Sequence, residues 1–158
     1  PATLPRVFPV GRLDWDSEGL LLLTNDGELA FRLSHPRYEV LKTYRVTVQR
    51  PIGDVELASL RTGVMLEDGP TRPARVRRLG EREFLISIRE GRNRQVRRMC
   101  AAVGHQVVRL VRVAEGPLRL GKLPSGALRS LTGVEVAALR HEAGLTAKTS
   151  LQTQPSGV

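Results

Sequence analysis

Cysteine is nearly absent from the sequence. Cys100 stands alone among 158 residues, so neither an internal disulfide nor a cysteine-based metal cluster can form within the chain. Such sparing use of cysteine fits a reducing cytoplasm. The three histidines are far apart and lack the spacing of metal ligands. We therefore expect a cytoplasmic protein that holds no metal.

Aromatic residues and long apolar runs are also scarce. Aromatics make up 4% of the chain, so a core must consist mainly of leucine and valine. A run of about 18 apolar residues is missing, which predicts that no helix spans a membrane. The first residues lack a basic stretch followed by an apolar one, so we expect no signal peptide. The 41% apolar composition suffices for one packed domain.

Charge, by contrast, is abundant and unbalanced. The formal net charge is +9, and residues 72–98 alone hold ten arginines against three glutamates. An arginine run of this kind is either a solvated face or a contact surface for phosphates. Guanidinium groups match phosphate geometry better than lysine does, and the positive balance attracts nucleic acid. The composition therefore favours a folded protein that binds nucleic acid.

Residue patterns predict an α+β fold with a mixed, mainly antiparallel sheet and short helices packed on it. A domain over residues 1–143 is expected, while residues 144–158 are rich in Thr, Ser and Gln without periodicity and predict a disordered tail. A Thr132–Glu135 capping box predicts the start of the last helix. The expected strands are 20–23, 40–49, 74–79, 83–89, 107–113 and 118–123, and the expected helices are 29–33, 55–61, 95–103 and 136–140.

One carboxylate stands out because of its place in the chain. Asp14 precedes the leucine run 20–23, which predicts a buried strand directly behind the loop. Catalytic groups often lie on loops that a rigid scaffold supports. Chemistry alone leaves two interpretations open: Asp14, Asp16 and Glu18 solvate a surface turn, or Asp14 is a functional carboxylate.

A set of ordered motifs distinguishes between these interpretations. The motifs are Gly11-Arg12-Leu13-Asp14 continuing through Gly27, then Lys42-Thr43-Tyr44, Glu90-Gly91-Arg92-Asn93-Arg94-Gln95-Val96-Arg97-Arg98-Met99, Val103-Gly104-His105 and Leu110-Val111-Arg112. In this order and spacing they strongly resemble the bacterial ribosomal-RNA pseudouridine synthases of the small-subunit synthase A family, which includes the large-subunit synthases B, E and F. The resemblance covers roughly residues 7 to 140 and is closest to the large-subunit members.

The resemblance implies a reaction without metal or cofactor. Family members isomerise a uridine in RNA to pseudouridine by moving the glycosidic bond from N1 to C5 of the same base. The Asp of the first motif is the family's nucleophile, which gives that role to Asp14. A carboxylate can stabilise or trap an oxocarbenium-like sugar. Attack at C1′, attack at C6 and proton abstraction all stay open at this point.

The resemblance also assigns the companions of Asp14. Tyr44 matches the tyrosine that stacks on the target base near C5, although from its strand position alone it would be a packing residue. Arg97 matches the arginine that pairs with the nucleophile, because a buried carboxylate needs a partner to stay ionised. Leu110 matches the apolar residue beneath the tyrosine.

Further arginines are expected to bind the substrate. Arg12 matches the family arginine that contacts RNA and fills the gap left by the flipped base, whose unstacking costs a few kcal/mol. Arg92, Arg94 and Arg98 are interpreted as phosphate contacts or as structural pairs. The implied partner is a ribosomal RNA stem-loop, and we expect a monomer with no membrane partner.

Family members usually carry a small RNA-binding domain, a linker and a strand with a Lys-Pro motif ahead of the nucleophile loop. This chain begins shortly before Asp14, so we expect a catalytic-domain fragment, and whether it is active without the absent parts stays open at this point. Two other functions stay open. One is a basic ribosome-assembly module that binds RNA without catalysis, and the other is a glycoside hydrolase that uses Asp14 and Glu18.

Overall fold

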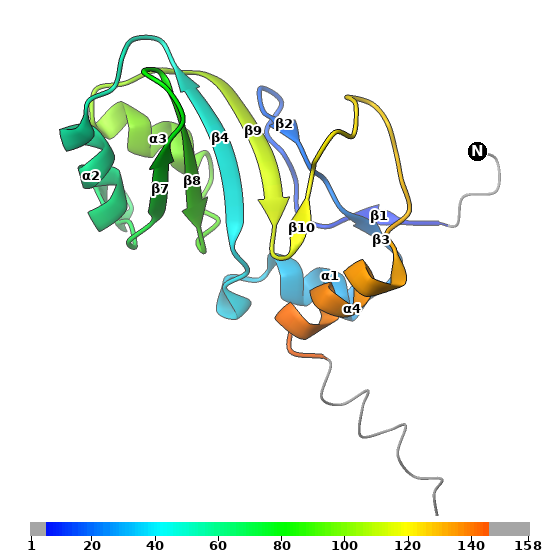
Figure 1. The fold of residues 1–158 in the computed structure, drawn as a ribbon. Coiled ribbons are helices and arrows are strands. Elements are labelled where there is room, and N and C mark those ends of the chain that lie inside the picture. Colours follow the sequence, from blue (N-terminus) through cyan, green and yellow to red (C-terminus); the bar gives the residue numbers. More distant parts are fainter. Residues whose placement is uncertain (1–5, 146–158) are drawn as a thin grey trace, which may run out of the picture.

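The computed structural model describes residues 6–145, and a mainly antiparallel sheet lies at its centre. The short strand β2 (Glu18–Gly19) pairs with the sheet in parallel, and all other neighbouring strands of this sheet are antiparallel (Figure 1). The predicted α+β fold is therefore confirmed. The strand order is β10 (Leu118–Arg119), β9 (Val107–Glu115), β4 (Lys42–Val48), β8 (Glu83–Ile88) and β7 (Arg75–Arg78).

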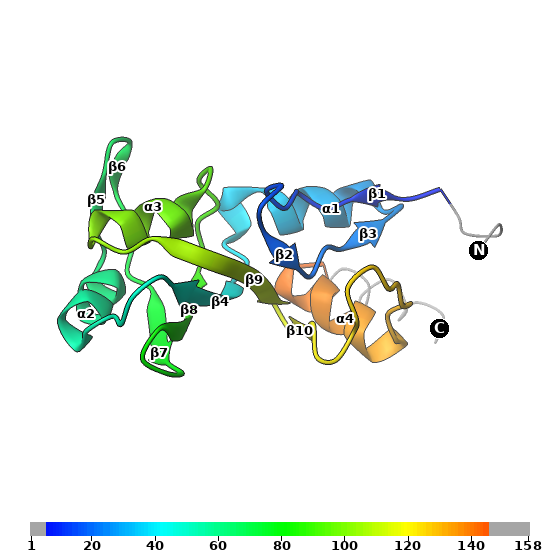
Figure 2. The same cartoon turned by 90° about the horizontal axis from the view of Figure 1, so that it is seen from above.

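Helices gather at the two ends of this sheet. Helices α2 and α3 lie beside β7 and β8, whereas α1 and α4 lie together near β10 and the N-terminal strands (Figures 1 and 2). Two small hairpin-like sheets pair β1 with β3 and β5 with β6. The bounds are α1 Gly27–Ser34, α2 Asp54–Thr62, α3 Gln95–Ala102, α4 Gly133–Glu142, the 3-10 helix Pro36–Tyr38, β1 Phe8–Pro9, β3 Leu23–Thr24, β5 Met65–Leu66 and β6 Gly69–Pro70.

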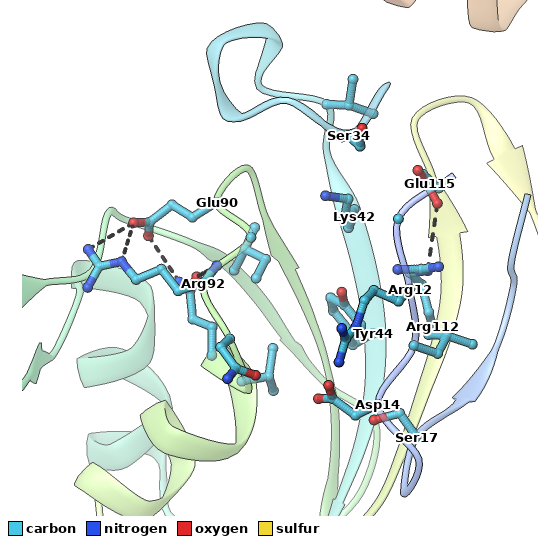
Figure 3. A pocket seen from close by; sticks show the side chains of 18 of the residues that line it. Arg12, Asp14, Ser17, Ser34, Lys42, Tyr44, Glu90, Arg92, Arg112 and Glu115 are labelled. Atoms are coloured by element: carbon cyan, nitrogen blue, oxygen red, sulfur yellow. Dashed lines mark hydrogen bonds and ion pairs between the residues drawn. The ribbon is translucent and has the colours of Figure 1, made fainter. Parts of the chain in front are cut away.

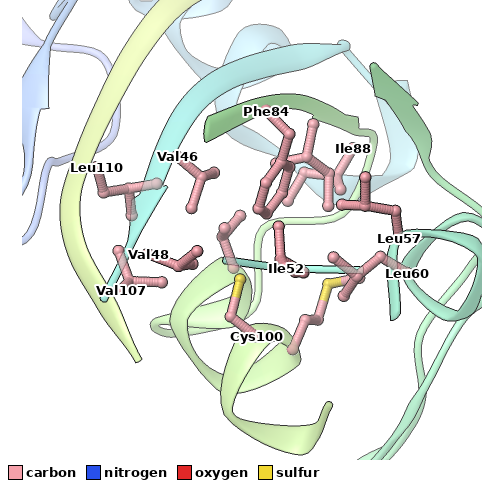
Figure 4. Packing of buried hydrophobic residues seen from close by; sticks show 13 residues of the cluster. Val46, Val48, Ile52, Leu57, Leu60, Phe84, Ile88, Cys100, Val107 and Leu110 are labelled. Atoms are coloured by element: carbon pink, nitrogen blue, oxygen red, sulfur yellow. The ribbon is translucent and has the colours of Figure 1, made fainter. Parts of the chain in front are cut away.

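Two hydrophobic clusters follow from this arrangement. The larger one fills the space between the sheet and helices α2 and α3, and it contains Val46, Phe84 and Met99, all with no exposed surface (Figure 4). Its strand residues recur at every second position, as one face of a sheet requires. The smaller cluster joins α1 to α4 through residues such as Leu33 and Leu139. The N-terminal loop and the sheet meet between the two clusters.

The predicted buried strand at 20–23 is wrong. Within this run Leu22 is buried, but Leu21 and Leu23 are 40% and 42% exposed. The reason is topological: β2 ends at Gly19 beside β9, and β3 begins at Leu23 beside β1. The leucine run therefore crosses from one sheet to another instead of lying inside one.

Side chains cap the first turns of α4 and α1. The Thr132–Glu135 capping box is present at the start of α4. The Asp26 side chain accepts a hydrogen bond from Leu29 N at 3.1 Å and caps α1. The cap of α2 is Gly53, which has no side chain to offer, while Asp54 lies inside the helix and binds Arg78.

The predicted tail begins too early, because Leu145 is buried in the smaller cluster. The rest of the tail, residues 146–158, lies outside the described residues. Among residues 6–145, no helix combines the length and the apolarity that crossing a bilayer requires.

Candidate active site

A cavity of about 430 Å³ opens between the two clusters and holds most of the predicted site residues. The loop before β2 contributes Arg12 and Asp14, and β4 contributes Tyr44 (Figure 3). Leu110 on β9 and Arg94 at the start of α3 line it as well. Residues from four distant parts of the chain therefore line one cavity.

The Asp14 loop is fixed to strand β9 by its backbone. Ser17 N donates to Asp14 O at 2.9 Å and closes a turn, and Leu20 N donates to Arg112 O at 2.8 Å. Gly19 between them has a φ of 114°, and a Cβ at this position would lie 2.3 Å from Arg112 O. Glycine is thus required for the loop to approach β9 so closely.

The pairing predicted for Arg97 differs from that in the structure. Its Nη2 donates to the backbone oxygen of Asp16 at 2.6 Å, and its Nε lies 3.5 Å from the Asp16 carboxylate. Arg94 forks onto the same carboxylate at 3.0 and 2.9 Å. The Asp14 carboxylate, 27% exposed, lies 3.9 Å from Arg94 Nη1. Asp16 therefore holds both cations beside Asp14, a role that the sequence did not reveal.

Backbone strain accompanies this arrangement. Arg94 is the N-cap residue of α3 and has a left-handed backbone, with φ at 51°. For a residue with a side chain, this conformation costs roughly 1–2 kcal/mol. The hydrogen bond from Arg94 lowers the pKa of Asp16 below its ordinary value of 3.8. The strain thus coincides with a charge-assisted fork that keeps Asp16 ionised.

Tyr44 forms one wall of the cavity. It packs against the larger cluster, which contains Leu110, as the resemblance implied. A register shift in the β4–β9 pairing places Tyr44 opposite Arg112. Burial raises the pKa of Tyr44, and the positive charge of Arg112 opposes this rise. The phenol is therefore protonated at neutral pH and can donate a hydrogen bond to a bound base.

Buried charges at the far side of the cavity were missed by the sequence analysis. Arg112 Nε donates to Leu20 O at 2.9 Å and lies 3.7 Å from Glu115 Oε1. Burial raises the pKa of Glu115, whereas it lowers that of Lys42 on the neighbouring strand. The sequence did contain a signal for these buried charges. Arg112 lies two residues from buried Leu110, and Lys42 lies two residues from Tyr44, so each charged side chain falls on the inward face of its strand.

Two of the expected phosphate contacts are occupied within the protein. Arg98 forks onto Asp68 at 2.9 and 3.2 Å, and Arg92 donates to Gly69 O at 2.9 Å. These contacts tie the β5–β6 hairpin to α3 and to the loop before it, which favours the structural interpretation of these two arginines. Arg12 is exposed at the cavity and makes no hydrogen bond or ion pair with any residue in the described range.

Comparisons with known proteins agree with this geometry. The family model described as RNA pseudouridylate synthase matches residues 1–102. "Ribosomal large subunit pseudouridine synthase E" of Xanthomonas campestris is 49% identical over 144 residues, covering 79% of this chain and 77% of the relative. "Ribosomal large subunit pseudouridine synthase B" of Bacillus subtilis is 46% identical over 141 residues, covering 85% of this chain. This chain spans only 58% of the length of that Bacillus protein.

Solved structures show the same relationship. The protein titled "Crystal structure of pseudouridylate synthase" superimposes with a TM-score of 0.81 at 39% identity, over 84% of this chain and 59% of that one. The "archaeal box H/ACA sRNP Nop10-Cbf5 complex", at 15% identity and a TM-score of 0.54, shares the fold. With the site geometry and these matches together, the chain belongs to the RNA pseudouridylate synthase family.

Proposed function

We propose that the protein isomerises a uridine of large-subunit ribosomal RNA to pseudouridine, with Asp14 as the nucleophile. The observation that carries this proposal is the cavity itself, in which a carboxylate on an anchored loop faces a tyrosine across a space of about 430 Å³. Two similar relatives bear the names of ribosomal large subunit synthases, which favours the large subunit as the source of the RNA.

The proposed reaction only rearranges the nucleotide. The N1–C1′ bond breaks, the C5–C1′ bond forms, N1 gains a proton, and C5 loses one. Asp14 would stabilise or trap the sugar while the uracil is detached, as a carboxylate does in a retaining glycosidase. Tyr44 would stack on the base and take part in removing the proton from C5, the role that the resemblance implies. The chemistry calls for no metal or cofactor.

RNA would have to present its uridine unstacked, since the cavity cannot admit a duplex. Arg12, exposed at the cavity and unpaired within the described range, is suited to contact the RNA and to fill the gap in the stack. Arg94 would contribute positive charge beside Asp14, and Arg97, bound to Asp16, would hold the Asp14 loop in place. Arg92 and Arg98 would act indirectly by holding the hairpin.

The remaining parts of the proposal rest on sequence. Residues 1–143 would form the catalytic domain of a cytoplasmic protein that acts as a monomer. The order and spacing of the motifs support the narrower assignment to the small-subunit synthase A family. A protein of this kind would recognise a stem-loop whose bases can be splayed out.

Tritium release tests the proposal. Full-length protein is incubated with large-subunit ribosomal RNA transcripts tritiated at C5 of uridine, because isomerisation sends that hydrogen to water. Release that scales with enzyme concentration supports the isomerase. Absence of release from transcripts and ribosomal particles alike, together with retained RNA binding, would identify a non-catalytic RNA-binding module instead.

A further inference from the structure

A second, smaller cavity lies on the other face of the sheet. It measures about 90 Å³ and is lined by three arginines, Arg72, Arg75 and Arg89, together with Ser87. Ser87 alternates with the buried residues Ile86 and Ile88 along β8, so its side chain points away from the larger hydrophobic cluster. The catalytic cavity, by contrast, contains Tyr44 on the cluster side.

The two cavities share a wall. Ile88 and Glu90, at the end of β8 and just beyond it, line both of them. An RNA strand that places its uridine in the large cavity and rounds this end of the sheet would therefore pass close to the small one. Its neighbouring phosphates are the groups that would reach the small cavity.

The charges of the small cavity suit an anion. Arg75 is exposed on the edge strand β7, and its side chain makes no ion pair or hydrogen bond within residues 6–145. Arg72 Nη1 lies 2.7 Å from Glu39 Oε1, and Arg89 donates to the backbone oxygen of Glu39 at 2.9 Å. Glu39 thus fixes two guanidinium groups and offsets one charge, while Arg75 stays available.

The other residues that line the small cavity are also compatible with a bound anion. The Ser87 hydroxyl lies opposite Arg75 in the strand register and 2.7 Å from the Thr43 hydroxyl, so it is ordered. Glu90 accepts the Arg72 backbone N–H at 2.8 Å and pairs with Arg92 at 3.0 Å, so its charge is already compensated. A phosphate group presents several acceptor oxygens that converging guanidinium groups recognise well.

We propose that the small cavity binds a backbone phosphate of the substrate RNA, next to the flipped uridine, with Arg75 as the principal contact. This inference rests on the proposed function, because it needs an RNA strand in the larger cavity. It assigns Arg75 to binding and leaves the chemical step to the Asp14 side of the sheet.

Arg77 provides a matched control. It lies two residues along the same strand, is also exposed, and likewise has no partner within the described part of the chain, but it does not line the cavity. Arg75→Ala and Arg77→Ala therefore remove the same charge from nearly the same place. A general attraction to RNA would respond to both, and a phosphate site only to the first.

The first measurement is the salt dependence of binding of the wild-type protein and both variants to the ribosomal RNA transcript that the wild type converts. Arg75→Ala is expected to weaken binding about fivefold and to lower the slope of log K against log salt by about 0.7–0.9. Arg77→Ala should leave both near wild type. Equal slopes for the two variants would overturn the proposal, whereas an inactive wild-type protein would overturn the proposed function.

The second measurement locates the phosphate. Neutral methylphosphonate linkages are placed one at a time on either side of the target uridine. At one linkage the wild type should lose as much affinity as Arg75→Ala does, and Arg75→Ala should lose nothing further. Additive losses at every linkage would show that Arg75 does not touch the backbone.

Discussion

Arg94 forks onto Asp16 with nitrogen–oxygen distances of 3.0 and 2.9 Å, directly beside the Asp14 carboxylate. The same aspartate accepts a hydrogen bond from Arg97 through its backbone oxygen. Asp16 thus determines where two cations stand relative to the proposed nucleophile. Geometry of this kind matters because small misplacements of catalytic groups can cost about a hundredfold in rate.

Asp16→Asn is expected to lower the turnover number by about 10–100-fold with little change in KM, since the side chain keeps its size but loses the charge that orders both arginines. Single-turnover tritium release measures this. Glu18→Gln is the control, because Glu18 pairs with Arg109 outside the cavity. Equal effects of the two substitutions would contradict a special role of Asp16.

The same carboxylate predicts a pH dependence of stability. Its pKa is lower in the folded state than its ordinary value of 3.8, chiefly through the hydrogen bond from Arg94. Its stabilising contribution is therefore complete above about pH 3.8 and is lost as the pH falls through the lower, folded-state pKa. The stability difference between wild type and Asp16→Asn should shrink in that range, as measured by urea unfolding. A difference that stays constant would contradict the pairing.

Gly19→Ala tests the anchoring of the Asp14 loop. The new Cβ would meet the backbone of Arg112 at 2.3 Å, and the residue also has a positive φ. We expect a loss of roughly 2–5 kcal/mol in the free energy of unfolding. Gly69 has the same φ of 114° but open space around it, so Gly69→Ala should cost about 1–2 kcal/mol. Equal losses in denaturant titrations would show that the contact with β9 is unimportant.

Arg98→Gln tests whether this arginine binds the hairpin. The hydrogen bond from Arg98 is the largest cause that lowers the pKa of Asp68, to about 2. In the variant, a carboxyl-carbon NMR titration should show that pKa rising toward 3.8. Arg92→Gln should have a smaller effect, since Arg92 makes one contact of 3.3 Å with Asp68. An unchanged pKa in Arg98→Gln would mean that this arginine is free for RNA.

Tyr44→Phe keeps the stacking ring but removes the hydroxyl. Turnover is expected to fall by about 10²–10⁴-fold, the usual contribution of a proton-transferring group, while RNA affinity changes little. Tyr38→Phe is the matched control, because Tyr38 packs against Phe31 and His35 instead of the cavity. Rapid-quench tritium release and RNA binding measure the two effects. A turnover near that of the wild type would show that Tyr44 is only a packing residue.

The sequence predicted the central strands well, because their alternation has one clear cause. Val46 and Val48 must face the core, and register follows from that requirement. The run at 20–23 failed for the opposite reason. Four leucines in a row do not indicate which sheet a residue joins, and here the pairing partner changes from β9 to β1 within the run.

The candidate site, too, could be predicted only in part from the sequence. Asp14, Tyr44 and Leu110, which the resemblance singled out, line one cavity in the structure. The partner of Arg97 was not predictable, because Asp14 and Asp16 stand two residues apart on one loop. Only the folded structure shows which of the two lies closer to Arg97. Glu115 and Lys42 face each other across β4 and β9, a pairing that depends on strand register and not on any local pattern.

Asp14→Asn gives the most direct test of the central claim. The substitution keeps the shape of the side chain and removes the carboxylate that the reaction requires. Tritium release from C5-labelled ribosomal RNA should become undetectable, whereas binding of the same RNA should stay within about twofold of wild type. Turnover at the wild-type rate by Asp14→Asn would contradict the account.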